Sequence, residues 1–114
     1  MIQVTVLVDS EQSNCGILMC GHAGYGEKDR HQQGQELVCA AVSALTLNMA
    51  NSVEHFTDTP FEAEMEEDSG LFCFRFTEKA GSEATLLINS LIFGLLDIEE
   101  EYGEPYIKIS YKEV

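Results

Sequence analysis

The stretch that decides the fold runs from Cys20 to Leu45 and reads CGHAGYGEKDRHQQGQELVCAAVSAL. A short apolar run typical of a β-strand ends at Cys20, and a polar segment with several glycines follows from Gly21 to Gln35. Apolar residues at helical spacing begin after Glu36. The stretch therefore predicts a strand, a long surface loop and a helix, and long loops in small domains are usually functional.

The two ends of this loop carry one histidine and one cysteine. His22 follows the strand, and Cys39 lies where the helix is expected to begin. A helix N-terminus favours a thiolate, its backbone N–H groups can bind an oxyanion, and a nearby imidazole can accept the thiol proton. Gly21 permits close backbone approach beside His22, and Ser43 lies one helical turn beyond Cys39 on the same side. The pattern indicates a cysteine nucleophile with a histidine base.

Other interpretations of these residues stay open. An equally good interpretation is that Cys39 is a small packing residue in the core, because cysteine is among the most buried residue types. His31, inside the loop, is an alternative base to His22. Cys15, Cys20, His22 and Cys39 form an alternative zinc-ligand set, although the first two lack the usual short pair spacing.

The loop itself is a candidate for contact with a substrate. Gly24, Gly26 and Gly34 give its backbone wide conformational freedom, and Tyr25 lies between two of them. We expect residues 23–35 to become ordered when a peptide binds, with these four residues as the substrate-loop positions.

The remainder of the chain alternates between strand and helix patterns. The segments expected to form strands are Ile2–Val8, Gly16–Cys20, Phe61–Met65, Leu71–Thr77 and Tyr106–Tyr111. Helices are expected from Glu36 to about His55 and from about Ser82 to Gly103. The order ββαββαβ predicts an α+β two-layer sandwich in which two helices pack on a mixed or antiparallel β-sheet, as one domain over residues 1–114.

Periodicity also predicts which side chains face the core. The inner face of the first helix is expected to be Val38, Val42, Leu45, Met49 and Val53. That of the second is expected to be Ala84, Ile88, Leu91, Leu95, Ile98 and Tyr102. Phe72, Phe74 and Phe76 should share one strand face, with Cys73 on the other.

The second helix is apolar on its remaining side as well. The residues that would face water there are Leu86, Ile92, Phe93 and Leu96. A two-layer domain covers only one side of a helix, so this apolar side predicts a homodimer.

Composition excludes several function classes. The 114-residue chain has 20 acidic and 6 basic side chains and a net charge of -14, so a nucleic acid would be repelled and a basic protein attracted. The N-terminus lacks the pattern of a signal peptide, and we expect no apolar run long enough to span a membrane. A cytoplasmic protein with thiols rather than disulfides is predicted. The acidic runs Glu66–Asp68 and Asp97–Glu101 are expected to be solvated, and His55 to lie at a helix C-terminus.

Three motifs carry a resemblance to a known family. They are Gly21-His22-Ala23 after the strand, Cys39-Ala40-Ala41-Val42-Ser43-Ala44 in the first helix, and Ile98-Glu99-Glu100-Glu101-Tyr102 in the second. With these, the chain resembles the ribosomal-processing cysteine proteases (Prp) of bacteria over essentially its full length. The resemblance implies that His22 and Cys39 are the catalytic dyad and that Gly21 and Ser43 belong to the site. Glu36 stands where members commonly have Asp, which implies a supporting role.

The resemblance also implies a substrate. Members of this family remove a short N-terminal extension from large-subunit ribosomal protein L twenty-seven by cutting after a pair of phenylalanines. No metal or organic cofactor is required for this chemistry. The alternative function is that of an acidic binding or assembly protein that holds a basic ribosomal protein without cutting it; such a protein would not need Cys39.

Overall fold

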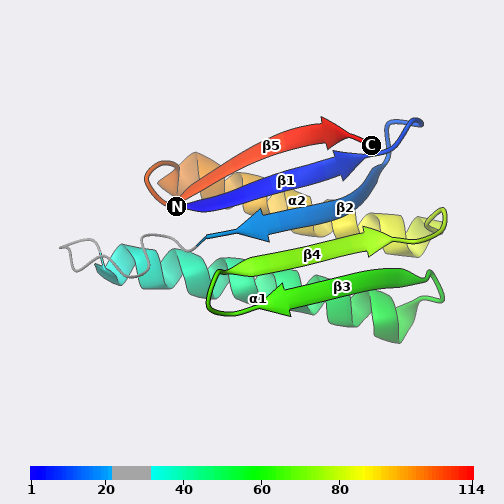
Figure 1. Cartoon of the computed structure of the whole chain (residues 1–114), viewed down its shortest axis with the longest axis horizontal. Helices are drawn as coiled ribbons and strands as arrows, with labels where there is room; N and C mark the ends of the chain where they lie inside the picture. The colour runs from blue at the N-terminus through cyan, green and yellow to red at the C-terminus, as the bar shows by residue number, and fades with distance from the viewer. Residues whose placement is uncertain (22–31) are drawn as a thin grey trace.

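Five strands form one sheet in the computed structural model, which describes residues 1–21 and 32–114. Two helices lie side by side on one face of this sheet (Figure 1). The elements are β1 (Ile2–Val8), β2 (Asn14–Cys20), α1 (Gln32–Phe56), β3 (Phe61–Glu66), β4 (Leu71–Phe76), α2 (Ser82–Tyr102) and β5 (Ile107–Glu113). The predicted order ββαββαβ and the two-layer α+β sandwich are confirmed.

The sheet is mixed, with strand order β3-β4-β2-β1-β5. β1 pairs in parallel with β5, while the other three neighbouring pairs are antiparallel. A parallel pair needs a long crossover, and here α1, the β3–β4 hairpin and α2 lie in sequence between β2 and β5. This topology places the start of β1 and the end of β2 at the same end of the sheet.

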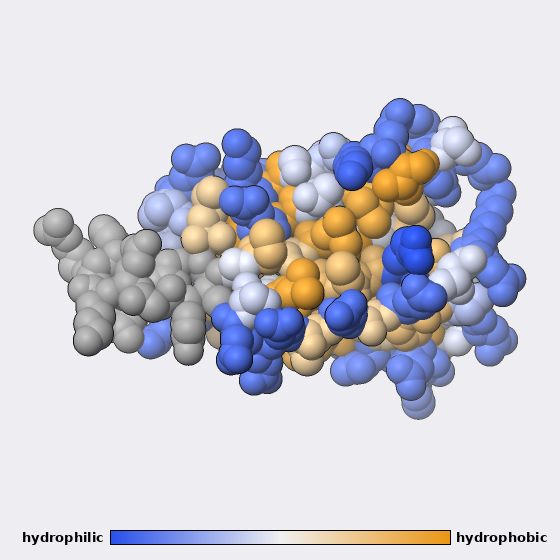
Figure 2. All heavy atoms as spheres, viewed as in Figure 1, coloured by the Kyte–Doolittle hydropathy of each residue, from blue (hydrophilic) through white to orange (hydrophobic). Residues whose placement is uncertain are grey.

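The core lies between the sheet and the helices. Phe72, Phe74 and Phe76 of β4 are all buried on this face, as their alternation predicts. Cys73 lies on the opposite face, again as predicted, and lines a groove of about 480 Å³ there together with apolar and charged side chains. Figure 2 views this opposite face, where apolar atoms lie between hydrophilic ones.

Two predictions for α1 were wrong. The helix begins at Gln32 rather than near Glu36, so the last residues assigned to the loop are helical and Gln35 is buried. Leu45 was expected in the core but is 37% exposed, whereas Thr46 is 3% exposed. Thr46 can be buried because its hydroxyl donates a 2.6 Å hydrogen bond to the Val42 carbonyl.

The flank of α1 that carries Leu45 faces α2. A Cβ atom on Gly94 would lie 3.1 Å from Leu45 Cδ1, so the glycine allows the two helices to approach closely there.

For α2 the predicted inner face is correct in part. Ala84, Ile88, Leu91 and Leu95 are buried, and Ile98 is partly buried against the core. Two assignments were wrong, because Ile92 is buried and Tyr102 is exposed. Ile92 is one helical turn beyond Ile88 and therefore shares its stripe, while Tyr102 lies in the last turn before Gly103 ends the helix.

One of the acidic residues assigned to solvent has a structural role. A carboxylate oxygen of Glu99 accepts a 2.6 Å hydrogen bond from the backbone N–H of Ile109 in β5. β5 is an edge strand of the sheet. The Glu99 carboxylate therefore satisfies a backbone N–H group that points away from the neighbouring strand.

The segment Gly34–Phe56 of α1 is, by length and composition, apolar enough to cross a membrane, so the expectation that no apolar run reaches that length was wrong. The same helix buries Val38, Val42, Met49 and Val53 against the sheet. Core packing accounts for these four side chains, while Leu37, Leu45 and Leu47 of the same helix are exposed.

Candidate active site

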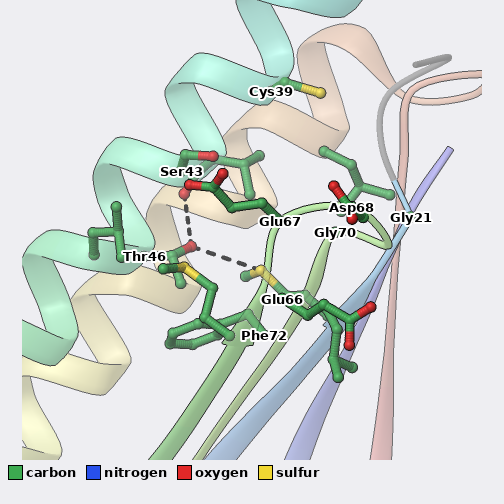
Figure 3. Close-up of a pocket in the computed structure, with 15 residues that line it drawn as sticks. Gly21, Cys39, Ser43, Thr46, Glu66, Glu67, Asp68, Gly70 and Phe72 are labelled. Atoms are coloured by element: carbon green, nitrogen blue, oxygen red, sulfur yellow. Dashed lines mark hydrogen bonds between the residues drawn. The ribbon is translucent and has the colours of Figure 1, made fainter. Parts of the chain in front are cut away.

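An open cleft of about 500 Å³ lies between α1, the end of β2 and the turn that joins β3 to β4. Its polar and small lining residues are Gly21, Cys39, Ser43, Thr46, Glu66, Glu67, Asp68 and Gly70 (Figure 3). Its apolar lining residues are Ile2, Met19, Val42, Leu47, Met65, Leu71 and Phe72. A cleft of this size, mostly apolar with a few polar groups, is typical of a ligand-binding site.

Cys39 lies on the flank of α1 that faces this cleft. Val38 and Val42 point into the core on the neighbouring face of the helix and thereby fix its rotation. The Cys39 side chain is partly buried and points from the helix toward the side of the cleft where Gly21 and Asp68 lie (Figure 3). Ser43 is one turn further on and lines the same cleft, as predicted.

The predicted position of Cys39 in the opening turn of the helix was wrong. Because α1 begins at Gln32, Cys39 lies about 10 Å along the helix axis from its N-terminus. Backbone N–H groups at that depth bond to carbonyls of the preceding turn, and the helix dipole acts mainly within the first turn. The start of α1 therefore does not supply the oxyanion donors that the sequence suggested.

Gly21 closes one end of the cleft and occupies a position that only glycine tolerates. Its φ is +85°, and a Cβ atom added there would lie 2.5 Å from the Met1 carbonyl oxygen. Its N–H donates a 3.0 Å hydrogen bond to the Ser69 carbonyl in the β3–β4 turn. The end of β2, the start of the chain and this turn are thus held together at the cleft.

Several predicted site residues lie outside the described residues. These are His22, Gly24, Tyr25, Gly26 and the alternative base His31. Their predicted roles, and the predicted ordering of the loop, stay predictions.

Two further predicted site residues, Gly34 and Glu36, both lie on α1. Gly34 was assigned to the substrate loop, but it is helical, and a Cβ atom there would lie 2.9 Å from the Tyr106 hydroxyl oxygen. That assignment was wrong, since Gly34 allows α1 to contact Tyr106. Glu36 is exposed on α1, about one turn before Cys39.

The other three cysteines lie away from the cleft lining. Burial, followed by the nearby Asp9 carboxylate, raises the pKa of the Cys15 thiol, which disfavours a thiolate there. Cys20 is exposed at the end of β2, and Cys73 lies on the opposite sheet face. Within residues 1–21 and 32–114, no three His, Cys, Asp or Glu side chains are grouped to hold a metal ion, and the proposed zinc set includes the undescribed His22.

Sequence reasoning missed the acidic rim of the cleft. Glu66, Glu67 and Asp68 were assigned to solvated charge, and they are exposed, but they also line the cleft beside Cys39. The hairpin turn was visible in the sequence, whereas its position over α1 depends on strand register between distant segments. Three carboxyl side chains therefore line the cleft together with Cys39.

Known proteins match this chain over nearly its full length. The family model described as "Cysteine protease Prp" matches residues 1–108. The ribosomal processing cysteine protease Prp of Staphylococcus aureus (strain Mu50 / ATCC 700699) is 31% identical over 112 residues, covering 98% of this chain and 100% of that protein. The protein of the same name from Bacillus subtilis (strain 168) is 34% identical over 108 residues, covering 91% of this chain and 92% of that protein.

Crystal structures of the S. aureus protease share the fold. One is a complex with a covalently linked product peptide, with a TM-score of 0.84 at 31% identity. The other is a complex with a substrate peptide, with a TM-score of 0.86 at 30% identity. Each comparison covers 98% of this chain and 100% of the crystallised chain.

Replacing Gly21 by alanine should destabilise the fold, because it adds a Cβ atom in the left-handed region and against the Met1 carbonyl. We expect a loss of about 2–3 kcal/mol in the free energy of unfolding, measured by urea denaturation. Gly81→Ala is the matched control, since its φ is -70° and the nearest atom to the new Cβ is 3.8 Å away; it should cost less than about 1 kcal/mol. Equal stability of Gly21→Ala and wild type would contradict this reading.

Proposed function

The chain belongs to the Prp family of cysteine proteases, and from that premise we propose that it is a ribosomal-processing endopeptidase with Cys39 as nucleophile and His22 as general base. One observation carries the assignment of the nucleophile. Of the four cysteines, all of which are described, Cys39 is the one that lines the cleft. Gly21, the chain neighbour of His22, lines the same cleft and so supports the choice of His22 as base.

The proposed mechanism is acyl transfer through a thioester. His22 accepts the proton of the Cys39 thiol, and the thiolate attacks the scissile carbonyl carbon to form a tetrahedral oxyanion. The oxyanion collapses, the peptide C–N bond breaks, and the leaving amine takes the proton from His22. Water then attacks the thioester and releases the acid product together with the free Cys39 thiol. Ser43 and Glu36, which flank Cys39 along α1, are proposed to position the dyad.

The proposed substrate is the N-terminal extension of ribosomal protein L twenty-seven, cut after a Phe-Phe pair. Both curated relatives are ribosomal processing proteases. Apolar side chains such as Met19, Val42 and Phe72 line the cleft beside Cys39 and suit aromatic side chains. The net charge of -14 suits a basic ribosomal protein, and such a substrate places the enzyme in the cytoplasm.

Cys39→Ala should abolish cleavage of a peptide that spans the Phe-Phe site while leaving folding and peptide binding largely intact, because it removes the nucleophile and little volume. Cys39→Ser should retain little activity, since a hydroxyl needs stronger base activation than a thiol. Mass spectrometry of the products is the measurement, with Cys20→Ala as the matched control because that thiol is exposed and lies outside the cleft lining. Undiminished turnover by Cys39→Ala would leave the non-enzymatic binding protein as the better account.

His22→Ala should lower kcat at least about 100-fold with substrate affinity nearly unchanged, because a general base typically contributes 10²–10⁴-fold. His31→Ala is the control from the same segment and should keep most of the activity. Should His31→Ala prove the more damaging change in steady-state kinetics, the base has been assigned to the wrong histidine.

A homodimer through α2 is also proposed. Leu86 and Phe93 are both 69% exposed and lie two helical turns apart, hence on the same side of the helix. Leu96 adds a further exposed apolar side chain, whereas Ile92 belongs to the core. Exposed large apolar side chains gathered on one helix favour contact with a second copy.

Phe93→Glu should shift the protein toward monomer, because a carboxylate in an apolar interface between copies is costly to desolvate. Sedimentation at high micromolar concentration measures this. Phe56→Glu is the control, since Phe56 is 68% exposed but lies at the end of α1. A wild-type protein that stays monomeric at that concentration would contradict the proposed homodimer.

A further inference from the structure

The start of α1 packs against Tyr106, which lies in the segment between α2 and β5. A Cβ atom on Gly34 would lie 2.9 Å from the hydroxyl oxygen of Tyr106 and 3.3 Å from its Cζ atom. Only a residue without a side chain therefore lets the helix and the ring approach so closely. The segment between α2 and β5, the start of β1 and the start of α1 all lie at the same end of the molecule (Figure 1).

The first turn of α1 has little helical stability of its own. Residues Gln32–Gln35 include no acidic side chain, which would favour a helix N-terminus, and Gly34 is a poor helix former. Gln35 is nevertheless buried, and Val38, about one turn further on, belongs to the core. Tertiary contacts, among them the Gly34–Tyr106 contact, therefore stabilise this turn.

Tyr106 is itself held in place by backbone and ring contacts. Its carbonyl accepts a 2.7 Å hydrogen bond from the Ile2 N–H, and its own N–H donates a 2.8 Å bond to the Gly103 carbonyl. Its ring packs against the core and meets the Tyr102 ring edge to face, with the ring centroids 6.5 Å apart. The ring is thus restrained from moving away from Gly34.

These contacts connect the start of α1 to the end of β2. Tyr106 contacts Gly34 through its ring and Ile2 through its carbonyl. Ile2 lines the cleft, and the carbonyl of the preceding Met1 packs against Gly21. A short series of contacts therefore fixes the position of Gly34 relative to Gly21.

The series ends next to both groups of the proposed dyad. Gly21 directly precedes His22 in the chain, and Gly34 stands five residues before Cys39. At a rise of 1.5 Å per residue, Gly34 is about 7.5 Å from Cys39 along the helix axis. A misplacement of about 1 Å between reacting groups can lower a rate by about 100-fold, so small shifts at these two glycines matter for catalysis.

Resting on the proposed function, we propose that Tyr106 is a positioning residue for the Cys39–His22 dyad. Through its contact with Gly34 it holds the first turn of α1 at a fixed place relative to Gly21. It acts through this contact and does not touch the substrate.

The test is Gly34→Ala, because the added Cβ forces the first turn of α1 and the Tyr106 ring apart. For a peptide that spans the Phe-Phe site we expect kcat to fall about 10-fold, with KM changed less than about threefold, because the cleft lining stays in place. Alkylation of Cys39 by iodoacetamide at pH 7, followed by mass spectrometry, should slow as well, because the thiolate is the reactive form and His22 accepts the thiol proton. Loss of folding has the opposite effect, since it exposes the thiol.

A second substitution tests whether the Gly34–Tyr106 contact is the cause. Tyr106→Phe removes the hydroxyl oxygen, which is the atom nearest to the added Cβ. Alone it should keep kcat within about threefold of the wild type, and in the Gly34→Ala background it should restore most of the lost kcat and alkylation rate. Gly94→Ala is the matched control, because it is also a helical glycine whose new Cβ would lie 3.1 Å from a side chain of the other helix, Leu45. It should leave the alkylation rate of Cys39 unchanged.

A wild-type kcat and alkylation rate in Gly34→Ala would overturn the proposal, as would equal losses in Gly34→Ala and in the double variant. If circular dichroism shows that Gly34→Ala does not fold, Tyr106→Leu replaces it and should show the same losses; wild-type values in that variant overturn the proposal too. No peptide cleavage by the wild type would overturn the proposed function, and the alkylation rates would then still decide whether Tyr106 sets the reactivity of Cys39.

Discussion

The burial of one stripe of α1 against the sheet is the constraint on which the rest of the molecule depends. Val38, Val42, Thr46, Met49 and Val53 follow this stripe and are all buried. Because a helix has a fixed period of 3.6 residues, the stripe sets the rotation of α1 about its axis. The flank facing away from α2 then presents Cys39, Ser43 and Leu47 to the cleft. The rotation of α1 that buries this stripe therefore also places Cys39 at the cleft.

The wall opposite α1 is held by backbone contacts. The bond from the Gly21 N–H to the Ser69 carbonyl fixes the β3–β4 turn at the end of β2, and the Met1 carbonyl packs against Gly21. This junction places the acidic residues Glu66, Glu67 and Asp68 along the lining of the cleft.

The sequence predicted elements whose residues alternate or repeat strongly, and it failed where position depends on distant contacts. Phe72, Phe74 and Phe76 alternate without ambiguity, so their shared face followed from the sequence. Leu45 was misplaced because hydrophobicity alone does not show that Thr46 satisfies its hydroxyl within the helix. Ile92 was misplaced although its spacing from Ile88 puts both on one stripe, because the sequence pattern did not show how wide the buried stripe of α2 is. That Cys39 and Ser43 lie on the same side of α1 was predicted, but the start of α1 was not, since the polar residues before Glu36 carry no apolar period. The position of the acidic residues at the cleft depends on the register of β3 and β4, which the sequence pattern does not determine.

The central claim is that Cys39 is the thiol that a bound substrate meets. A peptide ending in Phe-Phe with an electrophilic ketone at its C-terminus tests this directly, followed by mass spectrometric mapping of the labelled cysteine. The account predicts one adduct, on Cys39, with Cys20 unmodified even though Cys20 is the exposed cysteine among the four. An adduct on Cys20, or label spread over several cysteines, would contradict it.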